Sequence, residues 1–371
     1  MKIICSKTSL LKSVNISLKA VPSKTTMPIL ECILIDASTN QIKFTTNDME
    51  LGIETIVDGT IAEKGMVALD AKIFYEIIRR LPDNDVTIHT DEKYVATITC
   101  EKAKFTIPGK TGEDFAYLPV IERDESLTLS QFTLKEMIRQ TLFSIAVNEN
   151  NRLMTGELFE IKDNCLKIVS LDGHRISIRR MPLKREYSDK KIVVPGKTLS
   201  EISKILSGEV DDQVSIYFTK NHILFEFDQT MVVSRLIEGE YFRIDQMISS
   251  DYDTRLSVNK KEFLNCIDRA TLLVREGDKK PIVIDIRDNK MELKIDSSMG
   301  SMNEEIDIEK EGKDILIGFN PKFLIDALKV IDDENIHMYL MNPKAPCFIR
   351  DDEETYTYLI LPVNISQNQA R

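Results

Sequence analysis

The sequence predicts an α+β protein made of three similar domains, each with two helices packed on antiparallel sheets. One helical pattern recurs at a spacing of 125 residues, starting at positions 71, 196 and 321. A second helical pattern opens each unit, and runs of alternating apolar and polar residues stand between the two. Three such units use essentially all of the 371 residues, so no long insertion is left for a separate catalytic module.

Each unit repeats the same order of elements: a helix, a hairpin, a short apolar strand, a second helix and a further strand. Apolar residues every three or four positions indicate the helices, and Asn- and Asp-containing turns between alternating runs indicate the hairpins. The first helices are predicted at 9–21, 134–147 and 260–273. The hairpins are predicted at 33–46, 158–170 and 282–296. The second helices are predicted at 71–81, 196–206 and 321–331. The domains are predicted at 1–122, 127–250 and 254–371.

Composition limits the classes of function. The net charge of −11 argues against a protein coated in nucleic acid, although one basic face on an acidic body remains compatible with it. No apolar run approaches the length of a membrane span, and the start lacks the pattern of a signal peptide. The six cysteines form no CxxC pair and the four histidines no ligand pattern. We expect a cytoplasmic protein with free thiols and with no metal, cofactor or catalytic residue.

The tetrapeptide Pro-Gly-Lys-Thr occurs twice, at 108–111 and 195–198, and resembles half of a phosphate-binding loop. A complete loop needs an earlier glycine, because the backbone must curl around the phosphates. Lys104 and Lys191 stand where that glycine would be. We therefore expect a loop over 108–112 and a helix start at the second copy. The segment around Asp172 and Gly173 is predicted to be a tight turn between two strands.

The second helices carry basic residues on their solvent side. In each copy the apolar residues form one stripe, and two cations stand opposite it, two turns apart. These cations are Lys72, Arg79, Lys197, Lys204, Lys322 and Lys329. The face either lines a basic surface or is an ordinary solvated face with neutralising acids. The acids that recur beside it are Glu76, Glu201 and Asp326. Further cations along the first helices favour a basic lining.

Seven phrases spread along the chain resemble one protein family. They are VPSKTTMPILECILI at 21–35, TNDMELGIE at 46–54, TGELFE at 155–160, LDGHRIS at 171–177, RLIEGEY at 235–241, IGFNPKFLIDALK at 317–329 and YLILPV at 358–363. In register over the full length, they make the chain similar to bacterial DNA polymerase III beta subunits, the sliding clamps. The resemblance implies three clamp domains in each chain, and a head-to-tail homodimer that closes into a ring around duplex DNA.

The resemblance also implies the function, the partners and the site residues. A clamp is a non-enzymatic processivity factor that binds DNA without reading its sequence. It tethers the replicative polymerase, the clamp loader, repair polymerases and ligase-type proteins through short peptide motifs. The DNA-facing candidates are Lys12, Lys19, Lys24, Lys72, Arg79, Arg139, Arg152, Lys197, Lys204, Lys322 and Lys329. The peptide-cleft candidates are Met154, Leu171, Gly173, His174, Arg175, Ile176, Phe242, Met247, Leu359, Leu361, Pro362 and Val363. The dimer candidates are Phe105, Ile107, Leu272 and Leu273, for which ordinary core positions are the alternative.

Two departures from the family pattern concern the cleft. Leu171 stands where a threonine is common, and Phe242 stands where a proline is usual. They bear on which peptides bind, not on whether the cleft exists. Two rival functions stand beside the clamp: a nucleotide-dependent enzyme that uses the Pro-Gly-Lys-Thr segments, and a purely structural β-rich repeat protein.

Overall fold

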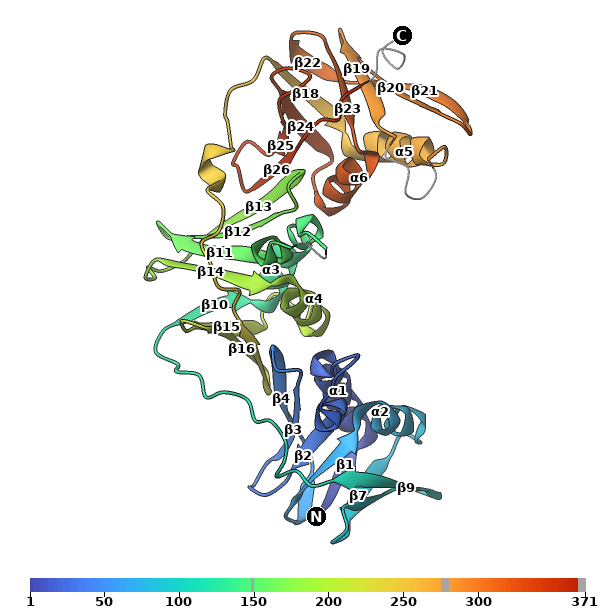
Figure 1. Ribbon diagram of the computed structural model, residues 1–371, viewed down its shortest axis with the longest axis vertical. Coiled ribbons are helices and arrows are strands. Elements are labelled where there is room, and N and C mark those ends of the chain that lie inside the picture. The colour runs from blue at the N-terminus through green and yellow to red at the C-terminus, as the bar shows by residue number, and fades with distance from the viewer. Residues whose placement is uncertain (148–149, 275–279, 366–371) are drawn as a thin grey trace. The chain divides into compact units, whose positions relative to one another are not determined.

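The computed structural model describes residues 1–147, 150–274 and 280–365 (Figure 1). The chain packs into two compact units. The first consists of Met1–Lys135 with Lys197–Leu236, and the second of Glu136–Gly196 with Ile237–Arg371. Among the described residues, no helix is long and apolar enough to cross a membrane.

One antiparallel sheet of thirteen strands runs through the first unit, in the order β10-β15-β16-β17-β4-β3-β2-β6-β9-β8-β7-β1-β5. Its strands are β1 (Lys2–Ser6), β2 (Cys32–Asp36), β3 (Ile42–Asn47), β4 (Leu51–Val57), β5 (Thr60–Glu63), β6 (Met66–Asp70), β7 (Asp85–Thr90), β8 (Val95–Cys100), β9 (Ala103–Lys110), β10 (Ser126–Ser130), β15 (Gln213–Phe218), β16 (His222–Phe227) and β17 (Thr230–Arg235). Strand β17 pairs with β4, and the hydroxyls of Thr55 and Thr230 hydrogen-bond at 2.9 Å.

Two helices pack on this sheet, α1 (Lys7–Ser17) and α2 (Ala71–Arg80). The side chain of Asp70 caps α2 by accepting the N–H of Ile73 at 2.8 Å, which satisfies a donor that the first turn leaves free. The apolar stripe of α2 is buried, and the ring of Phe74 meets the ring of Phe44 edge-on at 6.0 Å. The helix therefore presents its polar side to solvent.

The second unit contains two antiparallel sheets. The nine-stranded sheet runs β14-β11-β12-β13-β26-β25-β24-β18-β22, and the four-stranded sheet runs β21-β20-β19-β23. The first comprises β11 (Gly156–Lys162), β12 (Cys165–Leu171), β13 (Arg175–Pro182), β14 (Lys190–Pro195), β18 (Thr254–Asn259), β22 (Glu309–Gly312), β24 (Asn335–Leu340), β25 (Cys347–Arg350) and β26 (Tyr356–Ile360). The second comprises β19 (Ile282–Arg287), β20 (Lys290–Ser297), β21 (Gly300–Asp307) and β23 (Ile315–Phe319).

The helices α5 (Lys260–Thr271) and α6 (Pro321–Val330) pack against each other over the core of the second unit. Two further helices, α3 (Gln131–Arg139) and α4 (Gly196–Ile205), contribute residues to both units. Helices combined with antiparallel hairpins confirm the predicted α+β class. The three predicted hairpins form as β2–β3, β11–β12 and β19–β20, with positive φ at turn residues such as Asn164 and Asp288.

Two predicted boundaries are wrong. The helix expected over 134–147 ends at Arg139, because side chains take over the carbonyls of its last turn. The Thr141 hydroxyl donates to the Met137 carbonyl at 2.8 Å, and the Tyr358 hydroxyl donates to the Gln140 carbonyl at 3.1 Å. The loop expected over 108–112 is strand as far as Lys110, because β9 pairs with β8 and then with β6.

Candidate functional site: basic helix faces and an apolar cleft

The six cations predicted on the solvent side of α2, α4 and α6 are all exposed. Three of them bind the acid that recurs on their own helix. The ion pairs are Arg79–Glu76 (2.8 Å), Lys204–Glu201 (2.7 Å) and Lys322–Asp326 (2.8 Å). The hydrogen bond from Arg79 lowers the pKa of Glu76, so this pair stays ionised well below neutral pH. Half of these six cations are therefore neutralised by an acid on the same helix, which is the alternative to a basic lining.

Two other DNA-facing candidates bind acids that are distant in the sequence. The Lys197 ammonium bonds to the carboxylate of Asp48, whose side chain is only 5% exposed. The other oxygen of Asp48 accepts backbone N–H groups in the turn after β3. Arg139 contacts Asp332 at 3.0 Å as well as Glu136. A phosphate would therefore have to compete with a carboxylate at both cations.

Five of the remaining DNA-facing candidates have no carboxylate competitor among the described residues. Five lysines make no side-chain hydrogen bond or ion pair with any residue that the structure describes: Lys12, Lys19, Lys24, Lys72 and Lys329. Arg152 begins the short helical turn η4 (Arg152–Thr155). An ammonium without an acid partner keeps its full charge for an anionic ligand, so these five lysines are the strongest candidates for phosphate contacts.

Neither Pro-Gly-Lys-Thr segment forms a phosphate-binding loop. In the first, Gly109 lies in β9 and its N–H donates to the Tyr94 carbonyl at 3.0 Å, while the Lys110 ammonium bonds to the Pro28 carbonyl at 2.9 Å. The second starts α4 at Gly196, as predicted. The geometry gives no support to the nucleotide-dependent enzyme.

Several cleft candidates come together around β13 and β26, which are neighbouring strands inside the nine-stranded sheet. Ile176 pairs with Leu359 across the two strands, and the Leu361 N–H donates to the His174 carbonyl at 2.9 Å. The Asp172–Gly173 turn forms as predicted, with Gly173 at φ +84°. Five candidates share one apolar cluster: Met154, Leu171, Ile176, Phe242 and Leu359. They come from η4, β12, β13, the segment before η5 (Ile244–Gln246), and β26.

Three cleft candidates are not members of this cluster. Met247 follows η5 and is 47% exposed. Pro362 and Val363 follow β26, and the Val363 N–H donates to the Gly318 carbonyl at 2.8 Å. Beside the cluster, a cavity of about 210 Å³ is lined by Leu158, Phe242 and Ile244 and by charged side chains. Phe242, which replaces the usual proline, therefore borders both the cluster and this cavity.

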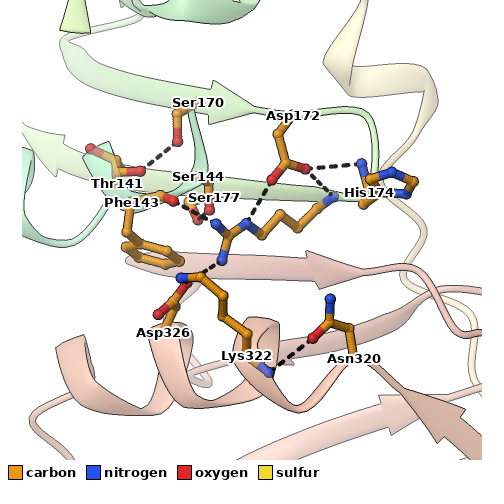
Figure 2. Close-up of polar contacts among 11 residues, drawn as sticks. Thr141, Phe143, Ser144, Ser170, Asp172, His174, Ser177, Asn320, Lys322 and Asp326 are labelled. Atoms are coloured by element: carbon orange, nitrogen blue, oxygen red, sulfur yellow. Dashed lines mark hydrogen bonds and ion pairs between the residues drawn. The ribbon is translucent and has the colours of Figure 1, made fainter. Parts of the chain in front are cut away.

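Arg175 is the most heavily bonded of the cleft candidates, and its side chain is only 7% exposed. Its guanidinium donates to Asp172 at 2.9 Å, to Asp326 at 2.7 Å and to the Phe143 carbonyl at 2.7 Å. Figure 2 shows these three acceptors converging from the turn after β12, from α6 and from the segment after α3. The guanidinium also lies over the rings of Phe143 and Phe323, 5.3 and 4.6 Å from their centroids.

The sequence did not single out Phe143 or Phe323 as part of this site. The ring of His174 stacks on Phe323 at 6.0 Å. A buried arginine with three acceptors is held in one position. The order of the cleft floor therefore depends on residues of α6 and of the segment after α3, which the phrase at 171–177 does not contain.

The dimer candidates fall into two kinds. Leu272 is 74% exposed and Phe105 is 39% exposed, so the core alternative is wrong for both. Ile107 and Leu273 pack partly on the cores of their own units. Phe105 also borders an apolar cavity of about 300 Å³ against α2, lined by Ile73 and Ile77 among others. Large apolar groups left in water at such a place are typical of an interaction surface.

Comparison with known proteins covers nearly the whole chain. Sequence models of the DNA polymerase III beta subunit match residues 1–119 (N-terminal domain), 128–242 (central domain) and 245–364 (C-terminal domain). The beta sliding clamp of Staphylococcus epidermidis is 35% identical over 364 residues, which are 95% of this chain and 96% of that protein.

Two solved structures extend the comparison. One, described as a DNA polymerase III beta subunit of Eubacterium rectale, is 68% identical with a TM-score of 0.96 and covers 98% of this chain and 100% of that one. The other is a sliding clamp of Pseudomonas aeruginosa bound to griselimycin, 21% identical with a TM-score of 0.93, covering the same shares of the two chains. At that identity, the second likeness concerns the fold alone.

Proposed function

The chain belongs to the DNA polymerase III beta subunit family, the sliding clamps, and from this premise we propose that two copies close head to tail into a ring around duplex DNA. Membership of the family makes the chain a non-catalytic replication subunit. We place its three clamp domains at 1–122, 127–250 and 254–371, and its site of action on the nucleoid in the cytoplasm.

Two exposed strand edges support the head-to-tail contact. Along Ala103–Pro108, β9 pairs only with β8 among the described strands, so its other edge is open beside Phe105. In the second unit, β21 ends the four-stranded sheet, and a side chain at Gly300 would meet Leu273. Open edges flanked by exposed apolar side chains are suited to pairing with another strand. Joining β9 of one copy to β21 of the other would cover both edges.

The helix count gives a ring of suitable size. The described part of each chain has six α-helices, so a dimer has twelve. Helices packed about 9–10 Å apart give a circumference of about 110–120 Å. After subtraction of helix bodies about 10 Å thick, the hole is still about 25 Å across. Duplex DNA can pass through such a hole without being gripped.

Sequence-blind phosphate contacts fit the charges on the helices. Base readout would stall a sliding ring, whereas mobile ammonium groups meet each phosphate in turn. Lys72 and Lys329 have no acid partner among the described residues, and the ion-paired cations, which are themselves exposed, can exchange their carboxylate for a phosphate. The acidic remainder of the surface disfavours DNA binding outside the ring, which explains why a DNA-bound protein carries a charge of −11.

We propose that the apolar cleft binds short peptide segments of the polymerase and of other DNA-processing partners. A groove floored by Leu171, Ile176 and Leu359, with Met154 at its side, suits apolar anchor residues. His174 and Arg175 add polar groups that fix the orientation of a ligand. The Pseudomonas aeruginosa clamp has been solved bound to griselimycin, and we propose that this compound binds the present chain in the apolar cleft.

The mass of the protein in solution tests the ring. We expect a particle of twice the chain mass of 42.5 kDa by sedimentation at micromolar concentration. Phe105→Asp or Leu272→Asp should give the single-chain mass, because each buries a charge in the apolar contact. Val210, which is 64% exposed in the segment between α4 and β15, supplies the matched control Val210→Asp, and this variant should remain a dimer. A wild-type protein that sediments as a single chain would overturn the proposal.

Griselimycin binding tests the cleft separately. Calorimetric titration should show one site for each chain, and Leu361→Asp, which changes a cleft candidate that is 37% exposed, should weaken binding while the protein still folds. Val210→Asp, which changes an exposed residue of the first unit, is the control that should keep the affinity. The cleft assignment fails for this chain if the wild-type protein does not bind the compound.

A further inference from the structure

A single carboxylate oxygen joins the cleft to the basic face of α6. The Oδ2 atom of Asp326 accepts from the Arg175 guanidinium at 2.7 Å and from the Lys322 ammonium at 2.8 Å. Lys322 is one of the DNA-facing candidates and Arg175 is one of the cleft candidates. Figure 2 shows Asp326 and Lys322 on the helix below the turn that contains Asp172 and His174.

The equivalent acids of the other two repeats have no such second partner. Glu76 on α2 bonds to Arg79 and Arg80, which lie on the same helix. Glu201 on α4 bonds to Lys204, also on its own helix. Among the described residues, the acid of the third repeat alone reaches a cation from another part of the chain, 151 residues away. The acids of α2 and α4 therefore serve as a comparison. A change at them reports the effect of losing an acid on a helix face, whereas a change at Asp326 also reports the loss of its bond to Arg175.

The two cations at Asp326 differ in how firmly they are held. The Lys322 side chain is 70% exposed, whereas that of Arg175 is 7% exposed and bears further bonds to Asp172 and Phe143. An approaching phosphate can therefore remove Lys322 from Asp326 but cannot remove Arg175. Because both cations use the same oxygen, the departure of Lys322 strengthens the bond between Asp326 and Arg175.

Resting on the proposed function, we propose that Asp326 is a positioning residue that couples DNA contact at Lys322 to ligand affinity in the cleft. With Lys322 on a phosphate, the undivided carboxylate fixes Arg175 between the rings of Phe143 and Phe323. The backbone beside Arg175 carries the His174 carbonyl that accepts the Leu361 N–H, so the cleft floor becomes better ordered. A pre-ordered floor binds its ligand more tightly. By linkage, an occupied cleft strengthens DNA contact by the same factor.

The exposure of Lys322 limits the size of the effect. An ion pair that is mostly in water changes an equilibrium by a factor of about 1.5 to 5. Loss of the Asp326 carboxylate should be more costly, because Arg175 is then left buried with one acceptor fewer. We expect a decrease in affinity of about 10-fold or more for that change.

The test is a titration of griselimycin into the full-length chain and into three variants. Lys322→Met should tighten binding about 1.5- to 5-fold, Asp326→Asn should weaken it, and the double variant should match Asp326→Asn alone. The matched control is Glu201→Gln on α4, whose carboxylate bonds to a cation of its own helix; this variant should leave the affinity for griselimycin unchanged. Lys322→Met changes an exposed side chain and tests the coupling even if Asp326→Asn unfolds, which thermal melting would show.

A second arm adds a short linear duplex at about 50 mM salt, where phosphate contacts are strong. The duplex should tighten griselimycin binding to the wild-type protein and leave Lys322→Met unaffected. The coupling is overturned by weaker griselimycin binding in Lys322→Met, by additive effects in the double variant, or by an effect of Glu201→Gln as large as that of Asp326→Asn. It is also overturned if the duplex does not change the affinity of the wild-type protein for griselimycin. Failure of the wild-type protein to bind griselimycin at all would instead overturn the cleft assignment, and the coupling with it.

Discussion

The buried carboxyl group of Glu157 predicts an unusual dependence of stability on pH. Glu157 lies in β11 opposite Val194, is 0% exposed, and neither of its carboxyl oxygens has a hydrogen-bond partner among the described residues. Burial raises its pKa to about 8. The nearby Thr141 hydroxyl acts to lower the pKa of Glu157, but burial is the larger effect. The Thr141 hydroxyl donates its proton to the Met137 carbonyl, so it does not hydrogen-bond to the ionised carboxylate.

The magnitude follows from the difference between the folded and unfolded pKa. In the unfolded chain Glu157 has its ordinary value of 4.5, so it releases its proton there first as the pH rises. The contribution of the neutral group to stability is complete below pH 4.5 and disappears as the pH approaches 8. At about 1.4 kcal/mol for each tenfold change, the whole loss is about 5 kcal/mol, with about 3 kcal/mol gone by pH 7.

Urea unfolding at several pH values between 5 and 8 measures this loss. Glu157→Gln has no proton to release, so its advantage over the wild-type protein should grow by about 2–3 kcal/mol between pH 5 and pH 7. Glu160, on the same strand, is the control: although burial alone would raise its pKa, the ammonium groups of Lys167 and Lys191 lower it. Glu160→Gln should therefore lose stability relative to wild type above pH 5. Parallel pH curves for the wild-type protein and Glu157→Gln would refute the reasoning.

Two further predictions concern DNA contact and backbone strain. Lys72→Ala should lower the slope of log affinity for duplex DNA against log salt concentration by about 0.9. Glu201→Gln should instead tighten DNA binding, because it frees Lys204 from its acid partner. Weaker DNA binding in Glu201→Gln would contradict the assignment of Lys204 as a DNA-facing residue. Gly312→Ala should destabilise the second unit by more than about 2 kcal/mol in thermal unfolding, because φ is +101° and a Cβ would lie 2.0 Å from the Asp253 carbonyl oxygen. Gly208, with open space around it, gives the control Gly208→Ala, and equal losses in the two variants would contradict the prediction.

The sequence predicts best those features that depend on local periodicity. Hairpins and the second helices follow from alternation and from a 3.6-residue repeat, and neighbouring acids on one helix are visible as possible ion-pair partners. The end of α3 could not be predicted, because it depends on Tyr358 reaching back to the Gln140 carbonyl. The extension of β9 to Lys110 could not be predicted either. It depends on pairing with β6, in which Ala68 lies opposite Lys110 and is distant from it in the sequence.

The candidate site also has parts that local sequence patterns predict and parts that depend on residues distant in the sequence. The phrase at 171–177 locates the cleft, and the exposed cations follow from helical spacing. Lys197 finds Asp48 across 149 residues, and Arg175 finds Asp326 across 151, so no local pattern indicates either contact. Glu157 could not be predicted as buried either, because a half-buried strand would place it on the solvent side, whereas both faces of β11 are covered.

Retention on DNA after assisted loading tests the central claim most directly. Clamps loaded onto a nicked circular plasmid should stay on it during gel filtration at a salt concentration that weakens phosphate contacts. The same clamps should be lost once the plasmid is cut to give free ends, because topology rather than affinity holds them. Equal loss from circular and linear DNA would contradict encirclement.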